Sequence, residues 1–114
     1  MPAIVFQAVA DAVTALREFD GDVETVTEIY LVDDANVLRG AVPLARMILA
    51  QPAARLAVLA EPRVLSCPWD MRQHAMAEIF DKYNLHSLAV VNAQGHLVGV
   101  VQSDQVISFL LERL

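Results

Sequence analysis

The sequence predicts a mixed α/β (α+β) protein made of two copies of one β-α-β-β-α unit, related by a pseudo-twofold axis. The main observation is an internal repeat: residues 30–42 and 88–101 both read as an apolar strand, a short polar turn and a second apolar strand. Residues 30–42 align with residues 89–101 without a gap, and Gly40 falls on Gly99. An amphipathic helical pattern follows each hairpin. Each half is too small to close a core alone, so the halves are expected to share one.

In the first half, residues 1–6 read as a strand fragment, and their abrupt apolar start predicts that natural sequence precedes them. Residues 8–19 contain no Gly or Pro and predict a helix. Its apolar stripe comprises Val9, Ala12, Val13 and Leu16. After an acidic break, two strands over 26–32 and 37–42 are expected to form the first hairpin, and Pro43 is expected to open the next helix. The buried face of that helix is predicted to hold Leu44, Met47, Ile48 and Leu49.

The two repeats are joined by an Ala- and Leu-rich segment that predicts a short linker helix. We therefore divide the chain into a first repeat over 1–52, truncated at its N-terminus, a linker helix over 53–62 and a second repeat over 63–114. The repeats differ by about four residues, because their helices align at an offset near 63 and their hairpins at 59.

The second half predicts a strand over 63–67 and a helix that ends at Asn84. Asp70 is the expected N-cap of this helix, with Gln73 as its reciprocal partner in a capping box. The residues expected to face the core are Met76, Ile79, Phe80 and Tyr83. Strands over 88–91 and 97–101 form the second hairpin, and Ser103 is the expected N-cap of a last helix that runs to Leu114. Asn36 aligns with Gly95, and both residue types accept a positive φ in a turn.

The composition is apolar for a chain without a membrane span. Hydrophobic residues make up 56% of the sequence and the mean hydropathy is +0.45. The most apolar region, 41–60, is interrupted by Arg46, Gln51 and Arg55, and so falls short of the roughly 18 apolar residues that suggest a transmembrane helix. We expect no membrane insertion and no signal peptide. The apolar excess predicts a large core or a self-association surface, and we expect a homodimer through helix faces.

Charge and cysteine content narrow the functional classes. The net charge of -6 argues against nucleic acid as a partner, because phosphate binding needs clustered Lys and Arg. The single cysteine, Cys67, excludes an internal disulfide and suits a reducing cytosol. It is expected to be a small buried residue at the end of a strand.

The repeated β-α-β-β-α order, with a strand ending in Gly-apolar-apolar before a helix, resembles the tandem CBS-domain (Bateman) module over nearly the whole chain. Within that class, residues 38–50 are similar to the first CBS domain of MgtE-type magnesium transporters. Residues 28–34, with the acidic connection before them, and residues 79–85 point the same way.

This resemblance implies a regulatory pair that is not catalytic and that dimerises, often as a flat disc. Many such pairs bind adenine nucleotides in clefts between their halves. In MgtE-type proteins the pair lies in the cytosol under the channel, and magnesium between facing acidic residues holds the pore shut. A divalent cation removes the repulsion between those carboxylates and so favours the compact state. The implied partners are a second copy and the remaining domains of a larger transporter-like protein.

The nucleotide motif of such modules is Gly, two apolar residues, Thr or Ser, two residues of any type, then Asp. The second repeat has Gln102 at the hydroxyl position, with Ser103 and Asp104 shifted by one residue. The first repeat has Pro43 at the hydroxyl position and Arg46 in place of the acid. The candidate nucleotide-binding residues are Gly40, Ala41, Arg46, Gly99, Gln102, Ser103 and Asp104. The departures weigh against adenine-nucleotide binding by the usual contacts, and a salt bridge is the commoner use of an Arg such as Arg46.

Magnesium is the other implied ligand, and four acids are candidates to hold it. These are Asp20, Asp22, Asp33 and Asp34, and each has the alternative reading of a solvated loop residue. Gln51 and Gln73 stand where acids would be typical of MgtE-type chains. The acidic loop does not fill the positions of an EF-hand, and the three histidines have no ligand spacing.

Three functions remain open. The first is a regulatory, ligand-responsive CBS pair of an MgtE-like magnesium or divalent-cation transporter, on the cytosolic face of the membrane. The second is a degenerate CBS pair that serves as a dimerisation scaffold without a ligand. The third is an adenine-nucleotide sensor attached to another protein. An enzyme is the least favoured class, because the sequence has no nucleophile-base pairing, no Walker-type loop and no metal cluster.

Overall fold

The computed structural model describes residues 8–21 and 23–102 of the 114-residue chain. The chain forms two compact units with a boundary between Val64 and Leu65, called unit 1 and unit 2 below. Each unit has its own sheet. The strand expected over 1–6 and the last helix expected after Ser103 lie outside the described residues, and the pseudo-twofold relation stays a prediction.

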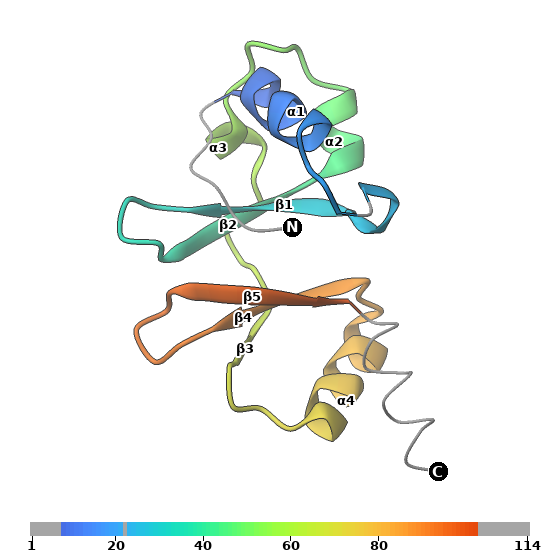
Figure 1. The fold of residues 1–114 in the computed structure, drawn as a ribbon, viewed down its shortest axis with the longest axis vertical. Helices are drawn as coiled ribbons and strands as arrows, with labels where there is room; N and C mark the ends of the chain where they lie inside the picture. The colour runs from blue at the N-terminus through green and yellow to red at the C-terminus, as the bar shows by residue number, and fades with distance from the viewer. Residues whose placement is uncertain (1–7, 22, 103–114) are drawn as a thin grey trace. The chain divides into compact units, whose positions relative to one another are not determined.

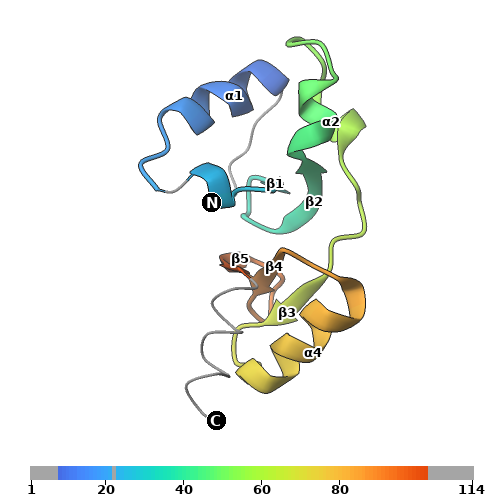
Figure 2. The ribbon, with the colours of Figure 1, turned by 90° about the vertical axis from the view of Figure 1, so that its right-hand side faces the viewer.

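Unit 1 is a β-hairpin with helices on one face (Figures 1 and 2). Its elements in chain order are α1 (Val9–Arg17), the 3-10 helix η1 (Val23–Thr25), β1 (Glu28–Val32), β2 (Leu38–Pro43), α2 (Leu44–Ile48) and α3 (Leu56–Leu59). The extra residues of the first repeat contain η1. The core consists of Val9, Ala12, Val26, Ile29, Val42, Met47 and Leu56.

Helix α1 confirms its predicted apolar stripe, since Val9 and Ala12 are buried and Val13 and Leu16 pack against the core. Its first turn is anchored by backbone from the linker. The Val9 N–H donates to the Ala54 carbonyl and the Ala10 N–H to the Pro52 carbonyl, both at 3.0 Å. These bonds satisfy helix N-terminal donors that have no partner inside the helix.

Unit 2 is a three-stranded sheet with one helix packed on it (Figure 1). Its elements are β3 (Ser66–Pro68), α4 (Gln73–Tyr83), β4 (Ser87–Val91) and β5 (Leu97–Gln102). β4 lies in the centre, parallel to β3 and antiparallel to β5. The core residues are Cys67, Met76, Phe80, Leu88 and Val90. This order confirms the predicted β-α-β-β arrangement of the second repeat.

The two hairpins share one register, as the internal repeat predicts. Leu31 pairs with Gly40 in unit 1, and Val90 pairs with Gly99 in unit 2. Each ladder then shifts at the next position, between Leu31 and Val32 and between Val90 and Val91. A shift at the same aligned site keeps the strand faces equivalent in both hairpins, because side chains alternate with a period of two.

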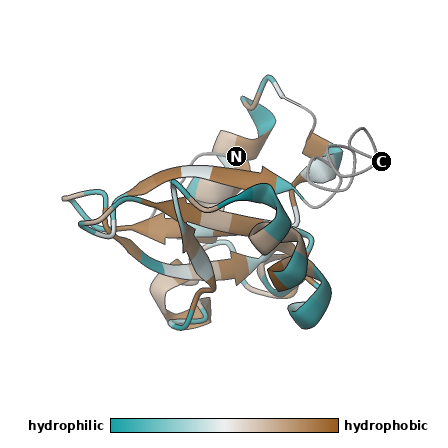
Figure 3. Cartoon of the chain, turned by 90° about the horizontal axis from the view of Figure 1, so that it is seen from below, coloured by the Kyte–Doolittle hydropathy of each residue, from teal (hydrophilic) through white to brown (hydrophobic). Residues whose placement is uncertain are grey.

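Three predicted turn and cap residues have the expected backbone. Asn36 has φ 64° and its counterpart Gly95 has φ 82°, so both hairpin turns contain a left-handed residue at the same place. Asn84 ends α4 in the left-handed conformation with φ 52°. In Figure 3 the strands are largely hydrophobic and the hairpin turns hydrophilic. Within the described ranges, no helix is long and apolar enough to cross a membrane.

The predicted buried face of α2 is wrong for two of its four residues. Met47 is buried and Leu44 partly buried, but Ile48 is 81% exposed and Leu49 88% exposed. The helix has five residues and carries apolar side chains on opposite sides, so only one side can reach the core of its own unit. The linker helix is also shorter than expected, because α3 covers only Leu56–Leu59.

Two predictions about α4 are wrong. The N-cap is Arg72, whose side chain does not cap the helix. Asp70 lies in the turn before it, where the Met71 N–H donates to the Pro68 carbonyl at 3.1 Å. That turn leaves too many residues before the helix for Asp70 to cap it. Tyr83 is 48% exposed, because it is the last residue of α4. The Lys82 ammonium lies 5.3 Å from the centre of its ring.

Candidate functional site

The hairpin turns are built by one polar residue each, Asp33 in unit 1 and Asn92 in unit 2. One Asp33 carboxylate oxygen accepts the N–H groups of Ala35 and Val37 at 2.9 and 3.0 Å. The Asn92 side-chain oxygen accepts the N–H groups of Gln94 and His96 at the same aligned positions, both at 3.0 Å. Asp and Asn favour such turns because their short side chains bond the backbone a few residues on.

The predicted magnesium ligand Asp33 is thus already occupied by its own hairpin. Its second carboxylate oxygen lies 2.8 Å from the Arg39 guanidinium. The Val37 amide hydrogen bond, together with Arg39 and the Ala35 amide, holds the pKa of Asp33 below its usual value against a smaller opposing effect of burial. A cation at Asp33 would compete with these donors, so Asp33 is a poor first ligand.

The other predicted metal ligands are placed without a shared centre. Asp20 follows α1 and Asp34 lies in the first hairpin turn, and both are exposed. Asp22 lies outside the described residues. Across residues 8–21 and 23–102, no group of three or more His, Cys, Asp or Glu side chains could hold a metal ion. Among the described residues, Asp20, Asp33 and Asp34 do not form a ligand set by themselves, and the magnesium site stays a prediction.

The three candidate nucleotide-binding residues of the first repeat lie close together, and the linker contacts each of them. Ala41 is buried and pairs with Tyr30 on β1, while its own N–H and C=O groups bond the linker at the other edge of β2. There the Ala41 N–H donates to the Glu61 carbonyl at 3.1 Å, and the Glu61 N–H donates to the Ala41 carbonyl at 2.8 Å. A Cβ on Gly40 would lie only 3.1 Å from that Glu61 carbonyl oxygen.

Arg46 completes this contact from α2. One guanidinium nitrogen lies 2.8 Å from a Glu61 carboxylate oxygen, and another donates to the Leu59 carbonyl at 2.8 Å. Arg46 therefore forms a salt bridge within the chain, which is the commoner use of such an arginine. Pro43 is the N-cap of α2 and supplies no side-chain cap, so the Leu44 N–H donates to the Thr27 carbonyl at 3.1 Å instead.

The second repeat presents its candidate positions differently. Gly99 lies on β5, and among the described residues no atom is within 4 Å of a Cβ built there. Gln102 is the last residue of β5 and is partly buried. Ser103 and Asp104 lie outside the described residues. The described part of this repeat thus shows no linker contact of the kind that covers Gly40.

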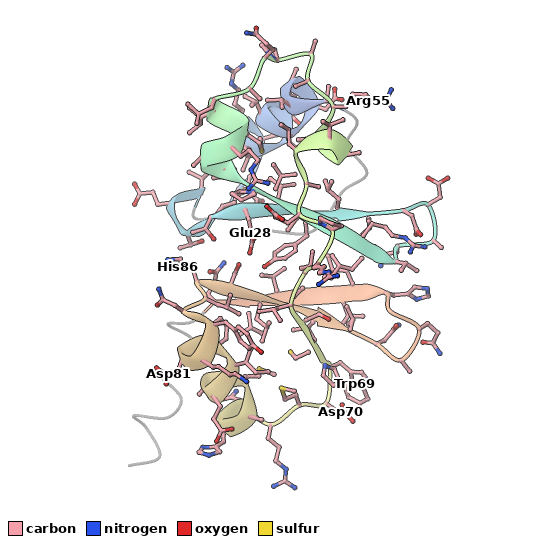
Figure 4. All side chains as sticks on the ribbon, turned by 180° about the vertical axis from the view of Figure 1, so that it is seen from behind. Glu28, Arg55, Trp69, Asp70, Asp81 and His86 are labelled. Carbon is pink, nitrogen blue, oxygen red and sulfur yellow. The ribbon has the colours of Figure 1, made fainter. Side chains whose placement is uncertain are left out.

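The loop between β3 and α4 carries Trp69, which is 65% exposed, and Asp70 beside it (Figure 4). The Trp69 N–H donates to the Val91 carbonyl at 2.9 Å, which fixes the loop to the end of β4. Cys67, two residues earlier, is fully buried, as predicted, and burial raises the pKa of its thiol. A neutral, inaccessible thiol is a packing residue rather than a nucleophile.

Glu61 is the residue that the sequence analysis missed. Glu61-Pro62 was interpreted only as the end of the linker helix. A local signal was present, since the residue before a proline favours extended backbone, which is the conformation needed to pair with a strand. The partner strand and Arg46 lie 20 and 15 residues earlier in the sequence, and spacing alone does not reveal that contact.

The comparisons with known proteins agree with this architecture. No family model matches the chain. The chain is 34% identical over 102 residues to the magnesium transporter MgtE of Thermus thermophilus, covering 90% of this chain and 23% of that protein. It is 27% identical over 103 residues to MgtE of Bacillus subtilis, again with 23% of the relative covered. The chain thus spans about a quarter of the length of the curated relatives it matches.

One solved structure is similar in both sequence and fold. It is the cytosolic domain of the Mg²⁺ channel MgtE in complex with ATP, with a TM-score of 0.86 and 32% identity. The match covers 94% of this chain and 44% of that one. The similarity extends across both units.

Proposed function

The chain is a tandem CBS-domain module similar to the cytosolic CBS pair of MgtE-type magnesium transporters, and from this premise we propose that it is the ligand-responsive, dimerising part of such a transporter. The observation that carries the proposal is the 34% identity to an MgtE transporter across 90% of the chain, which includes both repeats. In this proposal the module is cytoplasmic, it is not an enzyme, and it acts on further domains of a longer protein.

The ligand is tested by thermal melting at constant ionic strength with magnesium, calcium, ATP, AMP or S-adenosylmethionine. Constant ionic strength is needed because any salt screens the charge of -6. A ligand at about ten times its Kd adds about 1.4 kcal/mol to the stability of the fold that binds it. For a chain of this size that corresponds to a rise in Tm of about 5 °C. We expect this rise with magnesium.

A matched pair of variants assigns the magnesium response to predicted ligands. Asp34→Asn removes an exposed candidate ligand, and Asp70→Asn removes an exposed acid that is not a candidate. The rise in Tm with magnesium should shrink in Asp34→Asn and persist in Asp70→Asn. Equal rises in both would contradict the assignment. A Tm that responds to nucleotides alone would favour the nucleotide sensor, and a Tm that responds to none would favour the scaffold.

Dimerisation is the second part of the proposal, and the outer side of α2 supports it. Ala45, Ile48 and Leu49 are spaced as one helical stripe, and all three are exposed. A helix that is apolar on both sides is typical of a helix covered on both sides. The stripe itself carries no charged residue, so two copies of it can meet without placing like charges in direct contact.

We expect Ile48→Lys to weaken the dimer, because it places a charge in the stripe at a site where it leaves the core of unit 1 untouched. The apparent dissociation constant should rise about tenfold or more, the equivalent of about 1.4 kcal/mol. Light scattering over a dilution series measures the change. Val98→Lys, at an apolar β5 residue that is 55% exposed, serves as the control. A wild-type monomer at micromolar concentration, or an equal effect of both variants, would count against the proposal.

A further inference from the structure

The linker between the units crosses β2 at a site shaped to receive it. Gly40 has no side chain, and a Cβ there would meet the Glu61 carbonyl oxygen at 3.1 Å and the Ala60 Cβ at 3.2 Å. Next to it, the buried Ala41 exchanges two backbone hydrogen bonds with Glu61, at 3.1 and 2.8 Å. Buried backbone groups need partners, and Glu61 supplies both of those that Ala41 requires.

The crossing is limited to one pair of residues. Pro62 follows Glu61, and its ring holds φ at about −65°, far from the roughly −140° of an antiparallel strand. The contact consists of a single antiparallel bridge between Ala41 and Glu61. A one-residue bridge is weak by itself, because its two hydrogen bonds must offset the conformational entropy that the linker loses when it is fixed on the strand.

Arg46 compensates for this weakness by holding the linker at two points. Its guanidinium lies 2.8 Å from the Glu61 carboxylate and also donates to the Leu59 carbonyl at 2.8 Å. The side chains of Arg46 and Glu61 are 43% and 57% exposed, so salt and water reach the ion pair. The planar guanidinium can satisfy both acceptors together, whereas a Lys ammonium lacks this fixed fork.

We propose that Arg46 and Glu61 form a latch that closes the linker onto β2 and opens without unfolding unit 1. When the latch is closed, the linker belongs to unit 1 as far as Glu61, and residues 62–64 remain before the unit boundary. When it opens, the Ala41–Glu61 bridge is lost and the linker is released from β2 back toward α3. The latch thus sets the length of chain over which one unit is tethered to the other.

Hydrogen exchange of single amides tests the latch without any ligand, since exchange reports local opening. In Arg46→Ala we expect the Glu61 amide to exchange about fivefold faster or more, the ratio that corresponds to about 1 kcal/mol. The amides of Ile29 and Val42 in the core should keep their protection. High salt should speed exchange at Glu61 in the wild type and have little effect in Arg46→Ala.

The control is Arg39→Ala on β2, which removes another Arg–carboxylate pair of unit 1, with Asp33. It should leave exchange at Glu61 unchanged within about twofold, the scatter of surface substitutions. A second variant, Glu61→Gln, is read at the Ala41 amide, whose sequence neighbours are unaltered, so the test stands even if Arg46→Ala fails to fold. Wild-type exchange at Glu61 in a folded Arg46→Ala, or at Ala41 in Glu61→Gln, would overturn the latch.

Discussion

Replacing Leu88 by alanine is expected to lower the free energy of unfolding of unit 2 by about 2–5 kcal/mol. Leu88 lies on the central strand β4, has no exposed surface and belongs to the same core as Cys67, Met76 and Phe80. Truncation removes buried methyl groups and leaves a cavity that a strand hydrogen-bonded on both sides cannot close.

Urea unfolding measures this loss, and Trp69 makes it specific to unit 2. Trp69 is the single tryptophan of the chain and lies in the loop after β3. The midpoint of its fluorescence transition should fall in Leu88→Ala with an unchanged slope. Val98→Ala, on the neighbouring strand and 55% exposed, should change stability by no more than about 0.5 kcal/mol. Equal midpoints for the two variants would mean that Leu88 does not fill a closed core.

Gly40→Val is expected to destabilise unit 1 by about 1–3 kcal/mol, as overpacked sites do. The new Cβ would lie 3.1 Å from a backbone carbonyl oxygen of Glu61, which cannot rotate away, and 3.2 Å from the Ala60 Cβ. The linker must therefore shift, and the hydrogen bonds between Ala41 and Glu61 lengthen. The effect arises from close approach, since Gly40 is not among the residues with positive φ.

Gly99→Val is the matched control, because Gly99 occupies the same register in the second hairpin. Among the described residues nothing lies within 4 Å of its Cβ, and β-branched residues suit strands, so the substitution should be neutral or stabilising. Denaturation followed by circular dichroism compares the two variants. If Gly99→Val costs as much as Gly40→Val, the close approach of the linker is not the cause.

The hairpins were predictable from the sequence because local chemistry determines them. The alignment of Asn36 with Gly95 identifies the left-handed turn residues, and Asp33 and Asn92 supply the side-chain oxygens that hold each turn. Strand alternation then sets the register. Asn84 ended α4 for the same reason, since Asn tolerates a left-handed backbone at a helix end.

The wrong predictions have a common physical cause. Each of these features depends on parts of the protein beyond the local segment. Helical spacing places Ile48 about 100° around the helix from Met47, but it does not show which of the two meets the core of unit 1. Asp70 has the residue type of an N-cap, yet the turn at Met71 moves the helix start beyond it. The candidate site depends on Arg46 and Glu61, whose contact forms only after the chain returns to β2.

The linker crossing also affects how this apolar chain avoids aggregation. An open sheet edge offers unpaired N–H and C=O groups to any other extended chain. Glu61 covers those groups at Ala41, and the Pro62 that follows it has no N–H to donate to a further strand. The linker therefore protects this edge of β2 from pairing with other chains. A protein in which the linker is released would expose β2 as a template for intermolecular sheet growth.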